Sequence, residues 1–233
     1  MGQLLTIFEH LAQLRSGIIR SLAVLLISFF FALPLAPKIL RFLIAPAGRL
    51  VFVEPAGAFL AQMNAAFLVA VAVSSPIILY QSWRFVSEAF SPRLEKYIFS
   101  LVCLSFLLFW AGCVLGYCFM LPAGLNLLLG FAVPGLCPMI SVSRYLSFVF
   151  GVTVIFGVIF QLPLIMVFLS RLGLVSVKTL FRRQREAVLI IFIAGALLSP
   201  PDVISQILVS IPLLVLYESG LFVSWLLDRR VRG

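Results

Sequence analysis

The sequence predicts an all-α integral membrane protein, because its composition, its hydropathy and its charge-free runs all argue against a water-soluble surface. Of its 233 residues, 63% are hydrophobic and 11% are charged, and the mean hydropathy is +1.21. A soluble domain has about half apolar and about a quarter charged residues, since water must solvate its surface. No Asp, Glu, Lys or Arg occurs in the runs 21–37, 55–83, 97–143, 145–170 and 187–201. Several of these runs exceed the roughly 20 residues that carry a helix across ~30 Å of hydrocarbon.

The N-terminal segment 1–20 is expected to form an amphipathic helix that lies on a membrane surface. Apolar residues recur at helical spacing from Leu4 to Ile18, while polar residues such as Glu9 and Gln13 lie on another face. The apolar run that follows ends in prolines rather than in a small-residue cleavage site, so no cleavable signal peptide is expected.

Six transmembrane spans are predicted after this helix. They cover about 21–37, 63–83, 97–119, 146–170, 187–201 and 203–217. The segment 120–144 contains several prolines and glycines and is expected to be an outside loop.

The last two spans are predicted to be short, because a proline pair separates them. Pro200 and Pro201 stop one helix, and the side-chain oxygen of Asp202 can cap the next. Two readings of this shortness stay open: the spans thin the bilayer locally, or the last helix continues past Glu218 towards Trp225.

The basic residues predict the orientation of the chain. Of the 17 Lys and Arg residues, 13 lie in the N-terminus, the 84–96 and 171–185 loops and the C-terminus, which share one side in the six-span arrangement. The positive-inside rule then places both termini in the cytoplasm. The net charge of +9 is therefore interpreted as a topology signal and not as a nucleic-acid site.

The motifs that would indicate an enzyme are missing. The chain has one histidine and no H-E-x-x-H, G-x-S-x-G, C-x-x-C or Walker pattern, so neither catalysis nor a metal, nucleotide or other cofactor is expected. The four cysteines are interpreted as packing residues, with Cys118 and Cys137 left as a candidate disulfide pair if both face an oxidising compartment. A small-solute transporter is weakly supported, because ionisable residues are nearly absent from the spans.

Two polar features remain as candidate sites. Gln161 lies in mid-span, where it either packs between helices or receives a polar residue of another membrane segment. A cytoplasmic cluster forms either a solvated face or a partly acidic groove for a basic peptide. It consists of Glu9, His10, Gln13 and Arg15 with Glu88 and Glu95. The Gly112-x-x-x-Gly116 pattern is more typical of packing within the subunit.

Several motifs, which follow one another along nearly the whole chain, resemble the TatC family, the multispanning core subunit of the twin-arginine protein translocase. They are His-Leu-Ala-Gln-Leu-Arg at 10–15, Ala45-Pro46, Ser-Pro-Ile-Ile-Leu-Tyr-Gln-Ser-Trp-Arg-Phe at 75–85, Tyr-Leu-Ser-Phe at 145–148, Phe-Gly-Val-Ile-Phe-Gln-Leu-Pro at 156–163 and Leu-Ser-Pro-Pro-Asp-Val-Ile-Ser-Gln at 198–206. The structural turns of that family are matched here by Pro46, Pro200, Pro201 and Asp202.

The resemblance implies a cupped, six-span subunit of the cytoplasmic membrane that acts as receptor for folded proteins carrying twin-arginine signal peptides. It also implies an oligomeric complex with single-span subunits of the same system, driven by the proton gradient. In the family, carboxylates of the N-terminal segment and first cytoplasmic loop hold the signal's arginines, and a fourth-span glutamate contacts partner helices. Here His10, Gln13, Arg15 and Phe85 would shape the signal-peptide groove.

The chain departs from the family at those acids. Gln13 and Gln161 stand where glutamates are usual, and Gly17 replaces the second arginine of the N-terminal motif. A glutamine still accepts a hydrogen bond from a guanidinium but loses the charge-assisted part, so affinity for two arginines is expected to fall.

The first cytoplasmic loop is shifted as well. Glu88 occupies the proline position, and Leu94 falls where the loop glutamate belongs, with Glu95 one place later. Glu9 lies one helical turn from Gln13, so Glu9, Glu88 and Glu95 are predicted to supply a displaced acidic site. The alternative is a divergent member that reads other signals or serves as a scaffold.

Overall fold

The structure is a computed structural model that describes residues 2–47, 50–51, 56–90, 98–130, 139–198 and 203–232. These residues are almost entirely helical, and among them no β-strand forms beyond an isolated bridge between Val51 and Ser141. The helices are α1 (Gly2–Ala32), α2 (Ala36–Ile44), α3 (Gly57–Phe90), α4 (Ile98–Leu115), α5 (Leu121–Gly130), α6 (Val142–Ile159), α7 (Leu162–Arg171), α8 (Val177–Arg182), α9 (Gln184–Leu198) and α10 (Val203–Arg232).

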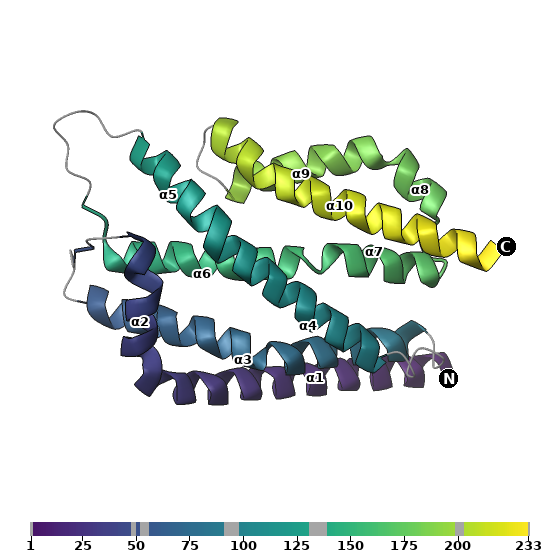
Figure 1. Ribbon diagram of the computed structural model, residues 1–233. Helices are drawn as coiled ribbons and strands as arrows, with labels where there is room; N and C mark the ends of the chain where they lie inside the picture. Colours follow the sequence, from purple (N-terminus) through teal and green to yellow (C-terminus); the bar gives the residue numbers. More distant parts are fainter. Residues whose placement is uncertain are drawn as a thin grey trace.

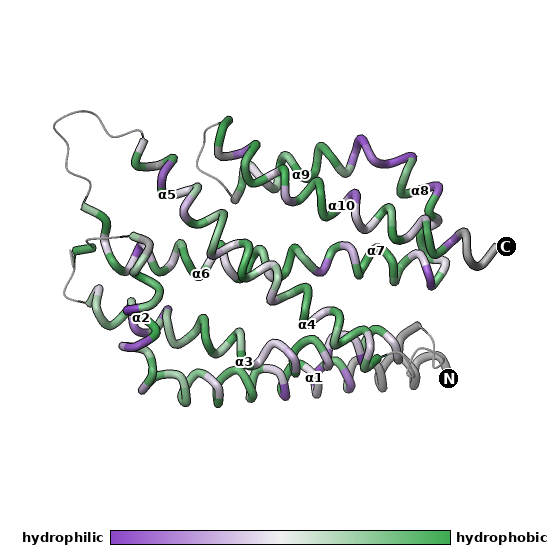
Figure 2. Tube along the Cα trace, viewed as in Figure 1, coloured by the Kyte–Doolittle hydropathy of each residue, from purple (hydrophilic) through white to green (hydrophobic). Residues whose placement is uncertain are grey.

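The long helices lie roughly side by side, with α1 and α3 along one edge, α6 and α7 in the middle, and α9 and α10 along the other edge (Figure 1). Helix α4 crosses this layer obliquely, and both chain termini lie at the same end of the bundle. Figure 2 shows hydrophobic residues along the length of the helices and hydrophilic residues gathered in α2 at one end and around α8 at the other. The all-α membrane fold is thereby confirmed.

Helix α1 joins two elements that the sequence analysis separated. The amphipathic segment 1–20 and the start of the first span form one helix that ends at Ala32. No proline precedes Pro34, and a change of hydrophobic pattern does not by itself interrupt the backbone hydrogen bonds of a helix. The 3-10 turn Leu33–Leu35 follows, and α2 then leads away from the axis of α1 (Figure 1).

The expected outside loop at 120–144 is wrong over its first part. Helix α4 continues through a π-helical turn at Gly116–Met120 into α5, which ends at Gly130. Pro122 is the second residue of α5, where the missing backbone N–H does not disrupt the helix start. Residues 131–138, which include Cys137, lie outside the described part.

The fourth apolar run is interrupted in the middle. Helix α6 ends at Ile159 and α7 begins at Leu162, so that Phe160 and Gln161 lie in a break between them. Pro163 explains the break, because it has no N–H to donate to the carbonyl oxygen of Ile159.

The last helix is not short. Helix α10 has 30 residues and passes both Glu218 and Trp225, in agreement with the second of the two readings, whereas α9 has only 15 residues. Five helical segments in the described part are long and apolar enough to cross a membrane. They are Ala12–Ile44, Gly57–Ser87, Ile98–Leu127, Val142–Arg171 and Gln206–Asp228. The count of six spans and the cytoplasmic termini remain predictions.

Close helix crossings and a few buried hydrogen bonds hold the bundle together. A Cβ atom added at Gly112 would lie 2.5 Å from the carbonyl oxygen of Phe156, so α4 and α6 touch through the glycine. This contact confirms that the Gly112-x-x-x-Gly116 pattern packs within the subunit. At the end opposite the termini, the buried Tyr145 hydroxyl donates to the carbonyl oxygen of Leu43 at 2.8 Å and ties α6 to α2.

Candidate functional site: the groove between α1 and α3

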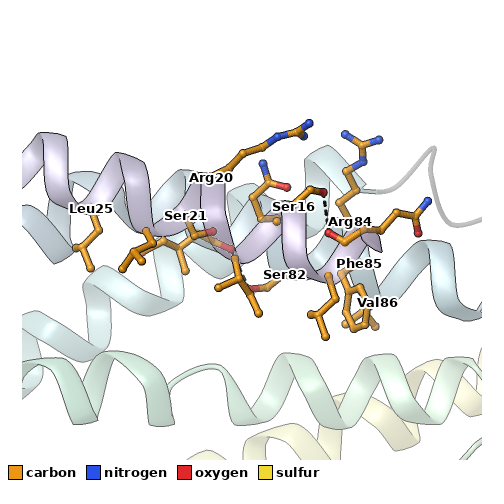
Figure 3. Close-up of a pocket in the computed structure, with 15 residues that line it drawn as sticks. Ser16, Arg20, Ser21, Leu25, Ser82, Arg84, Phe85 and Val86 are labelled. Carbon is orange, nitrogen blue, oxygen red and sulfur yellow. Dashed lines mark hydrogen bonds between the residues drawn. The ribbon is translucent and has the colours of Figure 1, made fainter. Parts of the chain in front are cut away.

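A groove of about 600 Å³ runs between α1 and α3 near the end of the bundle that holds the termini (Figure 3). Its walls come from the stretch 13–25 of α1 and the stretch 78–86 of α3. The two helices are paired along much of their length, so that segments far apart in the sequence share one surface.

The groove brings together two of the residues that the sequence singled out, Gln13 and Phe85. Arg15 is exposed on α1 and does not line the groove. The backbones of Glu9 and Glu88 belong to the same two helices, within one turn of Gln13 and Phe85.

Other predicted residues lie outside the part of the structure that describes side chains. The side chains of Glu9, His10 and Glu88 are among them, as are Glu95 and the turn residues Pro200, Pro201 and Asp202 in their entirety. Pro46 lies in the 3-10 turn Ala45–Ala47 that follows α2.

The described lining of the groove is basic. Arg20 of α1 and Arg84 of α3 both contribute to it, together with hydroxyl and amide groups such as those of Ser82 and Gln81, and no described lining residue is a carboxylate. These two arginines were not predicted as site residues, because their positions near span ends were interpreted only as topology signals. A signal was available for Arg20, which follows Gln13 by seven residues and therefore lies on the same helical face.

Gly17 keeps the floor of the groove open. A Cβ atom added there would meet only the side-chain oxygen of Gln81, at 3.7 Å, which is ordinary van der Waals contact. The position that carries an arginine in the family motif is therefore empty space here, and a larger side chain at 17 has room to enter the groove.

Gln161 lies away from this groove, in the break between α6 and α7, and is 8% exposed. Its Nε2 donates to the carbonyl oxygen of Ser105 on α4 at 2.9 Å, while its Oε1 is buried without a hydrogen-bond partner among the described residues. The hydroxyl of Ser105 accepts a hydrogen bond from the indole N–H of Trp83 at 2.5 Å. Helix α3, helix α4 and the break between α6 and α7 thus meet in one buried polar network. Within it, the side-chain oxygen of Gln161 accepts no hydrogen bond from the described residues.

Among the described side chains, neither location gathers the ligands of a metal centre. No group of three His, Cys, Asp or Glu residues lies close together in the described ranges, and Cys103, Cys113 and Cys118 are free thiols. The two locations supply groups that can bind another chain through hydrogen bonds and charge: a polar groove at one end of two helices and a buried amide in the middle of the bundle.

The model of the family described as Sec-independent protein translocase protein (TatC) matches residues 9–212 of the chain. This chain belongs to the TatC family. The TatC protein of Carboxydothermus hydrogenoformans is 34% identical over 225 residues, which cover 94% of this chain and 93% of that protein. The TatC protein of Escherichia coli strain K12 is 31% identical, over 94% of this chain and 87% of its own length.

Solved TatC structures share the fold. A crystal structure of the twin-arginine translocase receptor TatC in DDM superposes with a TM-score of 0.81 at 33% identity, covering 92% of this chain and 99% of that one. A second structure of the twin-arginine translocase receptor TatC gives a TM-score of 0.83 at 32% identity and covers 93% of this chain and 98% of that one. The chain is therefore a multi-pass membrane component of the Sec-independent, twin-arginine protein translocase.

Proposed function

We propose that this TatC chain is the core receptor subunit of its translocase, which binds the signal peptides of folded proteins and exports those proteins across the cytoplasmic membrane. The observation that carries the proposal is the groove between α1 and α3, which gathers Gln13 and Phe85 on one surface. The names of the two solved relatives, each a twin-arginine translocase receptor, favour the same role.

Acidic residues at the cytoplasmic end of the groove attract the two arginines of the signal. Glu9 precedes Gln13 by one helical turn, and Glu88 follows Phe85 by three residues. Carboxylates form short, charge-assisted hydrogen bonds with guanidinium groups, and Glu95 adds a third carboxylate from the first cytoplasmic loop. Gln13 contributes an uncharged acceptor, so its share of the binding is smaller than a glutamate's. His10 and Arg15 of the same N-terminal motif are proposed to contact the peptide as well.

The order of charges along the groove sets how far the basic part of a signal peptide enters. Arg20 lines the groove about two helical turns beyond Gln13 on α1, and Arg84 lines it from α3 beside Phe85. Both arginines repel other cations. The twin arginines therefore bind at the cytoplasmic mouth, among the acidic residues, while apolar residues that follow them contact Phe85 and the apolar walls.

Partner subunits are proposed to meet the chain at Gln161. The break between α6 and α7 leaves its side-chain oxygen without a partner among the described residues, and a donor from a single-span subunit would satisfy it. Because the side chain is buried, this contact requires the break to open locally. The subunit acts without catalysis or cofactor in an oligomeric complex, and the proton gradient drives transport.

The test is the affinity of the purified protein in nanodiscs for a twin-arginine signal peptide, compared with the same peptide carrying two lysines. We expect tighter binding of the arginine peptide, because guanidinium pairs with a carboxylate through two parallel hydrogen bonds. Neutralising Glu9, Glu88 or Glu95 to glutamine is expected to weaken binding about tenfold, the effect of losing one charge-assisted hydrogen bond.

Glu186→Gln is the matched control. Glu186 is an exposed acid at the start of α9, paired with Arg183 at 3.5 Å, and its loss changes the net charge by the same amount. Equal binding of both peptides by folded protein, or an equal loss in Glu186→Gln, would contradict the receptor role and favour a scaffold that reads no twin-arginine signal.

A further inference from the structure

The α1–α3 groove has the chemistry of a phosphate site. Arg20 and Arg84 come from different helices and line the same groove, and in Figure 3 both side chains extend towards the same side of the two ribbons. The amide of Gln81 lies in the same lining, whereas the hydroxyl of Ser82 already donates to the carbonyl oxygen of Ile78 at 2.9 Å. Two guanidinium groups with neighbouring donors match the oxygens of a phosphate, which they hold in two-pronged geometry.

The same groove continues into an apolar section. Leu22, Leu25 and Ile78 line it on the side further from the end of the bundle that holds the termini. No other described helix covers the outer face of α1 beside it, where Ile18 is 57% and Leu22 is 53% exposed. The groove therefore pairs a cationic end with an apolar end that opens onto the surface that faces lipid.

The position of Arg20 along α1 calls for a counter-charge. It lies 12 residues before the end of the helix at Ala32, a rise of about 18 Å. The exposed basic residues Lys38 and Arg41 of α2 are predicted to lie at the far membrane surface, and the hydrocarbon of a bilayer is ~30 Å thick. In that orientation the backbone at Arg20 lies within the hydrocarbon layer, and its guanidinium, which reaches towards the near headgroups, is unfavourable there without a partner.

We propose that this groove binds an anionic phospholipid, with its phosphate between Arg20 and Arg84 and an acyl chain along Leu22, Leu25 and Ile78. An anionic headgroup such as phosphatidylglycerol fits better than a zwitterionic one, because the ammonium of phosphatidylcholine would face the same two guanidinium groups. The negatively charged phosphate of the lipid lies level with Arg20 and offsets the positive charge of the groove. The acyl chain and the apolar part of a signal peptide would share the same walls, so the lipid occupies the groove only while no peptide is bound. Its binding is therefore measured without peptide and does not depend on the proposed receptor role.

Intact-protein mass spectrometry of the full chain in a neutral detergent tests the site, with phosphatidylglycerol, phosphatidylcholine or glycerol phosphate added and no peptide present. We expect the wild type to retain phosphatidylglycerol preferentially. Arg20→Gln with Arg84→Gln is expected to weaken retention about tenfold. Gly17→Leu, which fills the groove and changes no charge, is expected to weaken it as well.

The control is Arg182→Gln with Arg185→Gln, two exposed basic residues of α8 and α9 whose replacement removes the same charge. Helical content of each variant is checked by circular dichroism. Retention that persists in Arg20→Gln/Arg84→Gln, or that falls equally in the control pair, would overturn the proposal. Displacement of the lipid by equimolar glycerol phosphate would also overturn it, because the site would then be one for free phosphate and not for a lipid.

Discussion

The N-terminal helix and the C-terminal half of the bundle differ in how much of their surface the protein itself covers. In the most apolar window of Ala12–Ile44, 6% of the residues are buried, against 33% in Val142–Arg171 and in Gln206–Asp228. In the second region a Cβ atom at Gly220 would lie 2.8 Å from the Cα of Pro163, whereas at Gly17 the nearest atom is 3.7 Å away. Helices α6, α7 and α10 therefore form a tightly packed scaffold, whereas most of the surface of α1 is not covered by the described residues of the protein itself.

The largest effect is expected when one methyl group is added to α1 and one to the contact between α4 and α6 of the scaffold. Gly112→Ala forces a Cβ atom against the backbone of α6 and is expected to lower the free energy of unfolding by about 3 kcal/mol, as overpacking does. Gly17→Ala is expected to be neutral or to stabilise by up to about 1 kcal/mol, because alanine favours helix and the site has room. Unfolding of both variants in detergent, followed by circular dichroism, measures the difference. A loss in Gly17→Ala as large as in Gly112→Ala would show that α1 is packed as tightly as the scaffold.

The buried amide of the scaffold gives the next largest effect. Gln161→Glu replaces the donor that faces the carbonyl oxygen of Ser105 with an acceptor, and we expect it to destabilise the protein by about 2 kcal/mol. Gln161→Leu loses the hydrogen bond but also removes the unpaired oxygen, so about 1 kcal/mol or less is expected. Thermal unfolding ranks the two variants.

The same leucine variant tests the partner contact. Insertion of Gln161→Leu into the membrane is expected to be normal, while co-purification of single-span subunits falls, because no hydrogen-bonding group remains at the break. Unchanged co-purification would remove Gln161 from the partner interface and leave it a packing residue.

The smallest expected effect lies at the opposite end of the bundle. Tyr145→Phe deletes the hydrogen bond to the carbonyl oxygen of Leu43 and is expected to destabilise the protein by about 1 kcal/mol. Tyr80→Phe is the matched control, because Tyr80 is 42% exposed on the surface of α3 and lies outside the packed interior. Equal unfolding free energies for the two variants would mean that the tie between α6 and α2 contributes nothing to stability.

Much of the fold was predictable because membrane helices are specified by local composition. The apolar runs indicated all five of the long segments found in the described part, and the spacing of Gly112 and Gly116 indicated their packing role. The errors have local causes too. Pro122 was taken as a loop signal, although proline is tolerated in the first turn of a helix. The hydrophobic pattern changes near residue 20, but nothing there stops the helix.

The site was predictable only in part, because a groove depends on which helices pair. Gln13 was identified from the polar cluster of the N-terminal segment and Phe85 from a family motif, and the structure places both in one lining. Arg20 and Arg84 belong to segments 64 residues apart, and only the pairing of α1 with α3 brings them into one groove. The partner of Gln161, the carbonyl oxygen of Ser105, is likewise a product of tertiary packing that no local pattern reveals.

The most direct test of the account asks which region contacts the signal peptide. A photoreactive amino acid placed at Phe85 in the groove, or at the exposed Phe181 of α8, is irradiated in membranes with a labelled twin-arginine peptide. The account predicts a crosslink from position 85 that excess unlabelled arginine peptide suppresses and the two-lysine peptide does not, with no such crosslink from position 181. A crosslink of equal strength from position 181, or none from position 85 in folded protein, would contradict the assignment of α1 and α3 as the receptor face.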